Sequence, residues 1–277
     1  MRLHPLVSGE MQIRPWLGEL REGPAAALRE LLTFLQPKTT WLPVPVYLVE
    51  HPVAGPILVE TGLDPSAASD PAKTMGRLFG SVLFSYRLAK RTVREQLADR
   101  GIDPDAIRTV VMTHLHTDDH AGGVGQFPGG DFIVDRREWE VATARRSILK
   151  GYYRPVLARS GRWKLADYAT AQPYGAFART LDLFGDGSVR LLSTPGHSAG
   201  HQSVLLRLQS REALLYVDAA HYERQLREEL TFPMAHSKRT HRETLAEIHR
   251  FVVEHPNALV IPGHDPRVWS QLEPVYE

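Results

Sequence analysis

Short runs of apolar residues, many of them β-branched, recur along the chain and predict a protein built mainly from strands. We expect strands over residues 41–50, 57–60, 107–112, 132–134, 189–192, 203–208, 213–217 and 258–261. Helical periodicity fits three segments between these runs, namely residues 93–101, 136–148 and 240–256. In the last of these segments, Thr240 and Glu243 have the spacing of a capping box at a helix start. Alternating strands and helices predict a single α/β domain over residues 1–277, with two sheets and helices outside.

Two stretches lack a clear period and are expected to be insertions in this domain. Residues 64–90 contain proline, alanine, serine and glycine together with an apolar patch, which is typical of a lid over a binding site. Within this lid, Phe79, Leu83, Phe84 and Tyr86 offer apolar surface for a substrate. Residues 150–184 are aromatic, contain several prolines and are expected to lie near a pocket.

Composition and charge narrow the possible functions. The 277 residues contain no cysteine, which excludes disulfides, thiolate metal ligands and cysteine nucleophiles. Lys and Arg number 33 against 32 Asp and Glu, a balance that disfavours a nucleic-acid partner. Residues 1–6 lack a continuous apolar stretch of signal-peptide length, and no segment approaches the length of a membrane span. We therefore expect a soluble, cytoplasmic protein with no membrane partner. Any bound metal must be held by histidine, aspartate or glutamate.

The richest cluster of polar residues directly follows a predicted buried strand. Residues 113–123 read Thr-His-Leu-His-Thr-Asp-Asp-His-Ala-Gly-Gly and place three histidines and two aspartates within seven residues. Alternate residues of an extended segment point the same way, so His114 and His116 can reach one ion. The carboxylate and imidazole beyond them can reach a second ion.

Later strands also end in candidate ligands. His197 follows the strand at 189–192, Asp218 follows the strand at 213–217, and His264 follows the strand at 258–261. A lone histidine after a strand is usually a structural polar residue, but placements in register with one motif indicate a shared site.

These positions resemble the metallo-β-lactamase superfamily over nearly the whole chain, including Glu60-Thr61-Gly62, where the superfamily usually has Asp-Thr-Gly. The resemblance implies an αββα sandwich, with two mixed β-sheets flanked by helices and a site for two divalent metal ions. The longer Glu60 is expected still to brace the motif loop. The implied ligands are His114, His116 and His197 for the first ion, an Asp-His pair and His264 for the second, and Asp218 for both.

The aspartate of that Asp-His pair has two candidates, because the superfamily motif has one aspartate where this chain has Asp118 and Asp119. Alignment on the following Ala-Gly-Gly makes Asp119 and His120 the ligands. Alignment on His116 instead makes Asp118 the ligand and puts Asp119 in the histidine position. We favour the first alternative, since it keeps one carboxylate and one imidazole.

Within the superfamily the motifs are most similar to those of the N-acyl homoserine lactone lactonases, and the lack of cysteine separates the chain from β-lactamases that use a thiolate at the Asp218 position. The lactonases hold the lactone carbonyl with a tyrosine shortly after the bridging aspartate. Here His221 stands at that offset and Tyr222 one residue later, so either can stabilise the oxyanion.

The implied reaction is opening of the lactone ring, which would quench quorum signals. A hydroxide bridging two ions about 3.5–4 Å apart attacks the carbonyl. Asp119 or Asp118 carries the proton to the leaving alkoxide. Zinc is the first choice of metal, with iron, cobalt and manganese as alternatives. The expected partner is a small lactone or ester, and a homodimer is the oligomer considered.

Other activities of the same fold remain open. One is a thioesterase resembling glyoxalase II, and another is a hydrolase of phosphotriesters or other esters. A noncatalytic protein with structural ions is disfavoured, because structural sites are usually closed and rarely need two adjacent ions.

Overall fold

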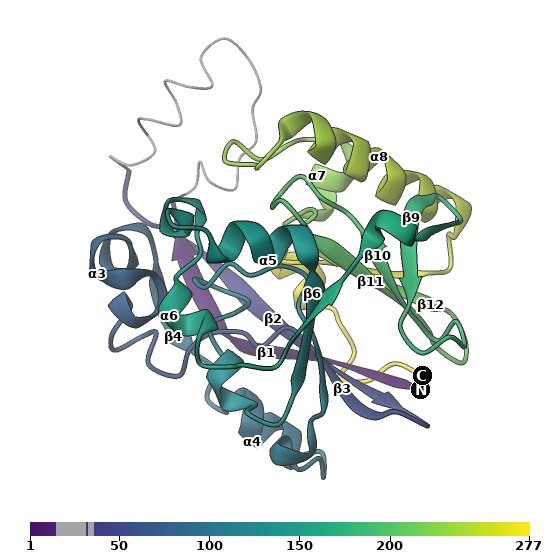
Figure 1. Ribbon diagram of the computed structural model, residues 1–277, viewed down its shortest axis with the longest axis horizontal. Coiled ribbons are helices and arrows are strands. Elements are labelled where there is room, and N and C mark those ends of the chain that lie inside the picture. The colour runs from purple at the N-terminus through teal and green to yellow at the C-terminus, as the bar shows by residue number, and fades with distance from the viewer. Residues whose placement is uncertain (15–31, 33–35) are drawn as a thin grey trace.

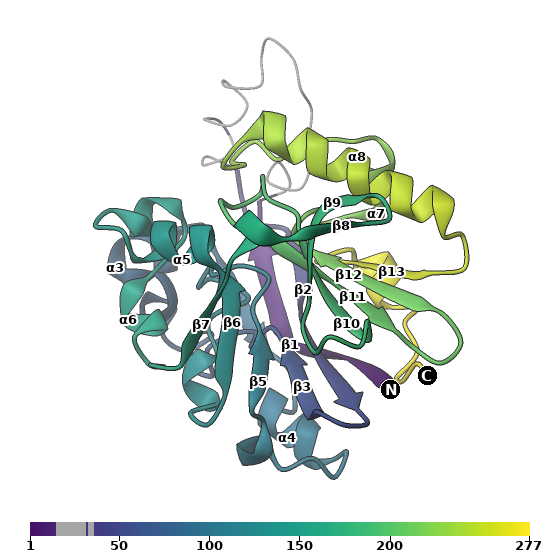
Figure 2. The same ribbon diagram turned by 45° about the vertical axis from the view of Figure 1, so that its right-hand side comes forward.

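Two β-sheets face each other at the centre of the computed structural model, which describes residues 1–14, 32 and 36–277 (Figures 1 and 2). The seven-stranded sheet has the order β4 (Ser85–Leu88), β1 (Arg2–Ile13), β2 (Thr40–His51), β3 (Gly55–Val59), β5 (Thr109–Val111), β6 (Asp131–Asp135) and β7 (Trp163–Ala166). The six-stranded sheet has the order β13 (Leu259–Pro262), β12 (Glu212–Val217), β11 (Gln202–Arg207), β10 (Val189–Ser193), β9 (Phe177–Asp182) and β8 (Gln172–Tyr174). Both sheets are mixed, with parallel pairs such as β3–β5 and β12–β13.

Helices α4 (Val93–Ala98), α5 (Arg136–Thr143) and α6 (Arg154–Leu157) cover the outer face of the larger sheet, and α7 (Glu223–Arg227) and α8 (Lys238–Glu254) cover that of the smaller sheet. The other helices are α3 (Ala72–Leu83) and α9 (Pro266–Trp269), whose Trp269 packs against the cluster between the sheets. Short 3₁₀ turns are η1 (Pro104–Ala106), η2 (Val124–Gln126), η3 (Ser147–Lys150) and η4 (Tyr168–Thr170). This arrangement confirms the expected αββα sandwich.

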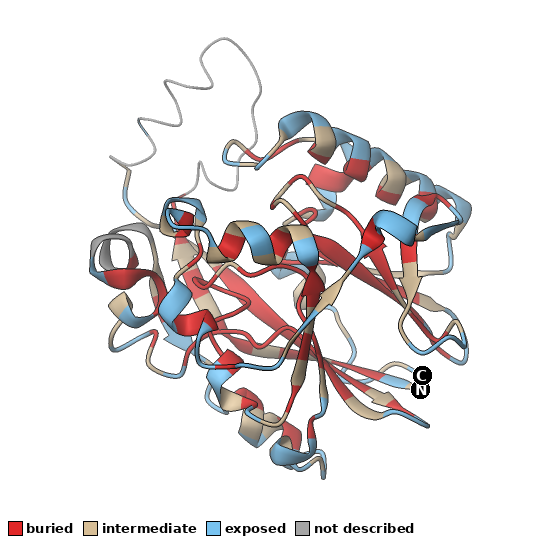
Figure 3. Cartoon of the chain, in the orientation of Figure 1, coloured by how far each residue is buried: buried red, intermediate tan, exposed pale blue. Residues whose placement is uncertain are grey.

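The alternation of side chains along β2 shows how the sandwich is filled. Val46 and Leu48 belong to the cluster under α4, α5 and α6, whereas Tyr47 and Val49 point the other way, between the sheets. Successive residues of a strand face opposite sides of the sheet. One strand therefore contributes side chains both to the cluster under the helices and to the cluster between the sheets. Figure 3 shows the resulting pattern, with buried strands inside and helices exposed on one side only.

Most elements expected from the sequence are present, with some differences. The helix expected over 136–148 ends at Thr143, and η3 follows it. Helix α8 begins at Lys238 and is capped by Ser237, whose Oγ accepts from the Thr240 N–H, so the capping box expected at Thr240 is wrong. Strands β1, β4, β7, β8 and β9 were not expected.

The two expected insertions contain regular structure. Residues 64–90 form α3 and then β4, which pairs with β1 at the edge of the larger sheet. Residues 150–184 include α6, the strand β9 and the edge strands β7 and β8. Their role as insertions stays a prediction. Among the described residues, no helix combines the length and apolar character needed to cross a membrane.

Candidate metal centre

Loops that follow β5, β10, β12 and β13 bring the candidate ligands together at one end of the sandwich. The β5 loop carries His114, His116 and residues 118–120, while the other three loops carry His197, Asp218 and His264. The first two loops are joined where Gln202 N–H donates to the Thr113 carbonyl oxygen at 2.9 Å.

Three imidazoles form the first group, with donor atoms all within 4.8 Å of one another: His114, His116 and His197. His116 Nδ1 lies 3.1 Å from His197 Nε2. Two neutral imidazole nitrogens that both present lone pairs at this distance repel each other unless a proton or a cation lies between them. The group therefore suits a cation.

A second group with the same spread of donor atoms consists of Asp119, His120, Asp218 and His264. Asp119 Oδ2 lies 3.7 Å from His264 Nε2 and 3.8 Å from His120 Nε2. All four residues are buried. Buried charges are normally paired or bound to a metal, and this group mixes two carboxylates with two imidazoles.

Asp218 lies between the two groups and turns one carboxylate oxygen toward each. Its Oδ1 is 3.1 Å from both His120 Nε2 and His264 Nε2. Its Oδ2 is 3.5 Å from His197 Nε2 and 3.8 Å from His114 Nε2. A carboxylate in this position can bind two adjacent ions.

Unsatisfied nitrogen atoms support the fit to metal ions. His114 Nε2 and His264 Nε2 are buried and make no hydrogen bond. In both rings the other nitrogen has an oxygen partner, since His114 Nδ1 lies 3.1 Å from Thr113 Oγ1 and His264 Nδ1 lies 2.7 Å from the Pro43 carbonyl oxygen. A neutral ring that donates a hydrogen bond from one nitrogen has a free lone pair on the other nitrogen. This is the usual state of a ligating histidine.

Burial sets the charge state of the first group. It lowers the pKa of His114 well below the usual value, and His116 adds to the effect. It also lowers the pKa of His197 well below the usual value, against the opposing charge of Asp218. Burial alone would raise the pKa of Asp218, but His264 and His221 outweigh it and hold that pKa well below the usual range. In His114, His197 and Asp218 these shifts favour the forms that bind metal. In the second group, burial alone would lower the pKa of His120, but Asp119 and Asp218 outweigh it and raise that pKa to about 9.

The structure places the two neighbouring aspartates differently. Asp119 joins the second group, whereas Asp118 is absent from the potential metal-binding groups of the described residues. Both line the adjacent cavity. Burial and the nearby charge of Asp119 raise the pKa of Asp118 well above its usual value. The geometry thus favours Asp119 as the ligand.

Glu60 occupies the expected place behind the motif loop. Its Oε1 accepts a hydrogen bond from the Thr113 N–H at 2.7 Å, and its Oε2 lies 3.9 Å from His120 Nδ1. Thr61 Oγ1 donates to the His120 carbonyl oxygen at 2.8 Å. Burial raises the pKa of Glu60 to about 7, although His120 opposes the shift.

His221 and Tyr222 lie in different surroundings. His221 lines the cavity, and its Nε2 is 3.2 Å from Asp218 Oδ2. Tyr222 packs instead against an apolar cluster that includes Leu63 and Tyr86. Of the two, only His221 borders the cavity.

Sequence reasoning missed Glu138, a fully buried residue of α5. Its Oε1 accepts from the Leu115 N–H at 3.1 Å, and its Oε2 accepts from the Gly200 N–H at 2.9 Å. One carboxylate thereby ties together the loops that carry the first group. A charged residue on a helix gives no sequence signal of burial, so this role was not predictable.

His241, a histidine of α8, is fully buried. Its Nε2–H donates to the Ala219 carbonyl oxygen at 2.7 Å, and its ring stacks on Phe232 at 5.1 Å between centroids. The helical position gave no hint of this burial, because the segment that covers it, around Phe232, has no regular pattern.

A cavity of about 480 Å³ opens onto the ligands. Polar groups at the metal centre, including His116, Asp119 and Asp218, form one side of it. The rest is mainly apolar and comes from several separate segments, with Ile13, Leu42, Met75, Phe84, Ile148 and Phe232 as examples. Tyr86, expected in the lid, is buried in an apolar cluster with Met11 and Leu63. The side chains of Phe79 and Leu83 lie outside the described residues.

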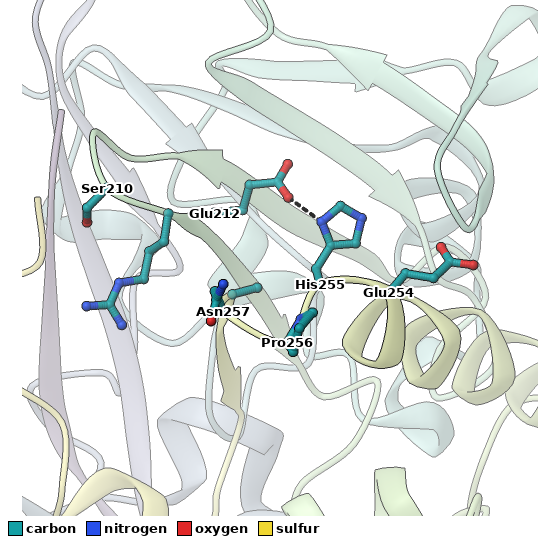
Figure 4. A pocket seen from close by; sticks show the side chains of 8 residues that line it. Ser210, Glu212, Glu254, His255, Pro256 and Asn257 are labelled. Atoms are coloured by element: carbon teal, nitrogen blue, oxygen red, sulfur yellow. Dashed lines mark ion pairs between the residues drawn. The ribbon is translucent and has the colours of Figure 1, made fainter.

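A second, more open hollow of about 270 Å³ lies between the start of β12 and the end of α8 (Figure 4). His255 and Glu212 form an ion pair there, with His255 Nδ1 2.8 Å from Glu212 Oε2. The described residues place no potential metal-binding group in this hollow.

Comparison with known proteins gives consistent matches. Residues 39–264 match the family described as the metallo-beta-lactamase superfamily. The chain is 30% identical over 275 residues to the N-acyl homoserine lactonase AttM of Rhizobium johnstonii, which covers 99% of this chain and 96% of that protein. It is 33% identical over 198 residues to the N-acyl homoserine lactonase AiiA of Bacillus thuringiensis subsp. kurstaki, which covers 69% of each chain.

Solved structures share the fold. One is an N-acyl homoserine lactone hydrolase with the product N-hexanoyl-L-homoserine at its catalytic metal centre; the TM-score is 0.78 at 23% identity, covering 98% of this chain and 96% of that chain. Another is AidC, described as a dizinc quorum-quenching lactonase; the TM-score is 0.63 at 15% identity, covering 95% of this chain and 87% of that chain.

Proposed function

Since the chain belongs to the metallo-beta-lactamase superfamily, we propose that it is a metal-dependent hydrolase that opens the lactone ring of N-acyl homoserine lactones. The observation that carries this proposal is the position of Asp218, between two groups of buried ligands at one side of a largely apolar cavity. The lactonases that are similar to this chain over nearly its full length support the choice of substrate.

We propose that two ions occupy the centre. His114, His116 and His197 hold the first, Asp119, His120 and His264 hold the second, and Asp218 binds both. When bound, such ions lower the pKa of a water molecule and polarise the carbonyl that it attacks. Zinc suits these nitrogen and oxygen ligands, and the structurally similar AidC is described as a dizinc enzyme.

The chain's own residues then hold and move protons. Asp118 and Asp119 both line the cavity, so either carboxylate is placed to accept a proton from the attacking water and pass it to the leaving alkoxide oxygen. The ring C–O bond breaks, and one water is consumed to give an acyl homoserine, whose new carboxylate releases a proton at neutral pH.

The apolar part of the cavity is the proposed site of the acyl chain. Met75 and Phe84 come from the expected lid, and Ile13 and Leu42 come from the ends of the two long strands β1 and β2. These side chains remove acyl CH₂ groups from water, at about 0.8 kcal/mol for each fully buried group. Longer acyl chains should therefore bind more tightly, up to the length of the cavity.

The test is proton release by the metal-loaded protein on a long-chain N-acyl homoserine lactone. We expect rapid release that chelation abolishes. The variant Asp218→Asn should also lose release, whereas Asp105→Asn, at an exposed carboxylate paired with Arg94, should keep it. No release from a protein shown to hold two ions would overturn the lactonase proposal, and release with thioesters would then indicate a glyoxalase II-like activity.

A further inference from the structure

We propose that His221 is an additional metal ligand, on the side of the centre formed by His114, His116 and His197. This inference rests on the metal centre of the proposed function and is independent of the substrate. His197, Asp218 and His221 form a third group whose donor atoms all lie within 4.8 Å of one another, and this group shares a residue with each of the other two.

The distances fit a shared ion. Nitrogen and oxygen ligands bonded at about 2.0–2.1 Å to one tetrahedral or five-coordinate ion lie about 2.9–3.4 Å apart when adjacent. His221 Nε2 is 3.2 Å from Asp218 Oδ2, and His197 Nε2 is 3.5 Å from the same oxygen. His221 is thus as well placed beside this oxygen as His197, one of the expected ligands.

An ordinary hydrogen bond from His221 to Asp218 explains the surroundings less well. Five imidazoles have a nitrogen within 3.8 Å of an Asp218 oxygen, namely His114, His120, His197, His221 and His264. His120 and His221 hydrogen-bond to this carboxylate, whereas His114 Nε2 and His264 Nε2 lie near it without a hydrogen bond. Cations between the rings and the carboxylate satisfy every group at once.

Both the backbone and the ring of His221 are held in place. Its backbone N–H donates to Gln225 Oε1 at 2.9 Å, and its carbonyl oxygen accepts from the His264 N–H at 3.0 Å. Its ring packs on Phe232 with 3.9 Å between centroids. A residue held at its backbone and packed along its ring loses little freedom when it binds an ion.

The consequence is a centre with one more nitrogen donor than the implied ligand set. The metal position formed by His114, His116 and His197 would then also have His221 beside it, together with the carboxylate of Asp218. An additional nitrogen donor would leave less room at that metal position for a substrate carbonyl to displace a ligand.

The experiment measures metal binding without substrate. Metal-free wild-type, His221→Gln and His221→Phe proteins are titrated with Co²⁺ against a chromophoric chelator, and the visible absorption of bound Co²⁺ is recorded. The variant His249→Gln, at an exposed histidine of α8, is the matched control. Glutamine can still donate a hydrogen bond to Asp218 but is a poor ligand.

In both His221 variants, we expect one of the two equivalents of Co²⁺ to bind at least about 10-fold more weakly than in wild type. The absorption spectrum of the bound Co²⁺ should also change. The control His249→Gln should match wild type in both respects. Unchanged affinity and spectrum in His221→Gln would overturn the proposal and leave His221 as a hydrogen-bond donor.

A second measurement needs no variant and uses the NMR spectrum of the Co²⁺-loaded wild type. Six strongly shifted ring N–H signals, five from the implied ligands and one from His221, support the proposal, and five contradict it. Loss of lactone hydrolysis alone would bear only on the proposed function.

Discussion

His241 joins helix α8 to the floor of the metal centre through a hydrogen bond to the Ala219 carbonyl oxygen, next to Asp218. The backbone nitrogen of Phe232 lies 3.4 Å from the other ring nitrogen of His241, Nδ1. A neutral ring with its proton on Nε2 satisfies both partners, whereas a charged ring would place a second proton against the Phe232 N–H. Burial lowers the pKa of His241 to about 4, against the opposing hydrogen bond to Ala219.

This lowered pKa predicts acid sensitivity in the metal-free protein. Between pH 6.5 and 4 the unfolded chain binds a proton at His241 that the folded chain does not. The free energy of unfolding therefore falls as the pH drops through that window, by up to about 3 kcal/mol from this residue. Urea unfolding at a series of pH values should show a smaller loss in His241→Gln than in wild type. An equal loss in the two proteins would show that His241 is not responsible, and His249→Gln serves as the exposed control.

A second prediction at the level of single residues concerns Glu138. In Glu138→Gln, one of the two carboxylate oxygens becomes an NH₂ group that faces an N–H donor, from either Leu115 or Gly200. The loops of the first group then lose a tie, and we expect metal to bind about 10- to 100-fold more weakly at that group. Chelator competition measures this effect. Glu140→Gln, at an exposed residue of the same helix, should bind metal like wild type, and the proposal fails if Glu138→Gln does so too.

The start of helix α8 supports the loop that carries His197. The Ser237 N–H donates to the Gly196 carbonyl oxygen at 3.1 Å, and Thr244 Oγ1 donates to the Pro195 carbonyl oxygen at 2.6 Å. Gly196 has φ of +135°, and a Cβ at this position would lie 2.3 Å from the His241 Cα. The loop and the helix therefore fit closely only with glycine at 196.

The N-terminal cap of helix α8 at Ser237 gives a prediction for stability. Ser237→Ala removes the side-chain acceptor of the Thr240 N–H and should lower the free energy of unfolding by about 1 kcal/mol. Glu243→Gln, which tests the capping box expected from the sequence, should change it by less than about 0.5 kcal/mol, because the ion pair of Glu243 with Arg239 is exposed. Denaturant unfolding of the two variants distinguishes the caps, and a larger effect in Glu243→Gln would contradict the structure.

At the scale of the whole molecule, the sequence predicts the architecture well because its signals are local. Buried strands such as 189–193 and 212–217 contain mainly apolar residues, and the candidate ligands follow them within a few residues. Strand β1 gave no such signal. It contains Pro5 and Gly9, and its pairing with β2 shifts register between Val7 and Gly9. Its stability comes from two neighbouring strands that are distant in sequence.

The parts of the site that the sequence left open or did not predict depend on tertiary contacts. The choice between Asp118 and Asp119 depends on which carboxylate faces His264, a residue of the last strand's loop. The burial of Glu138 depends on two backbone N–H groups from separate loops. No local pattern records such contacts, so periodicity and spacing cannot reveal them.

Removal of metal tests the molecule as a whole. Ions that bind only the folded chain stabilise it by an amount that grows with their concentration, about 4 kcal/mol at 1,000 times the dissociation constant. The midpoint of thermal unfolding should rise with added Zn²⁺ in wild type and rise less in Asp218→Asn. A midpoint that does not depend on Zn²⁺ would contradict a centre formed by these ligands.

The ligands of one group come from both sheets, with His114 on the loop after β5 in one sheet and His197 on the loop after β10 in the other. A bound ion is then a reversible cross-link between the two layers, in a chain that has no cysteine to form a covalent one. Closing a loop of about 100 residues restricts an unfolded chain by an amount worth about 4.7 kcal/mol in the entropic model. Metal supply would therefore set how long the protein survives proteolysis as well as how fast it turns over substrate.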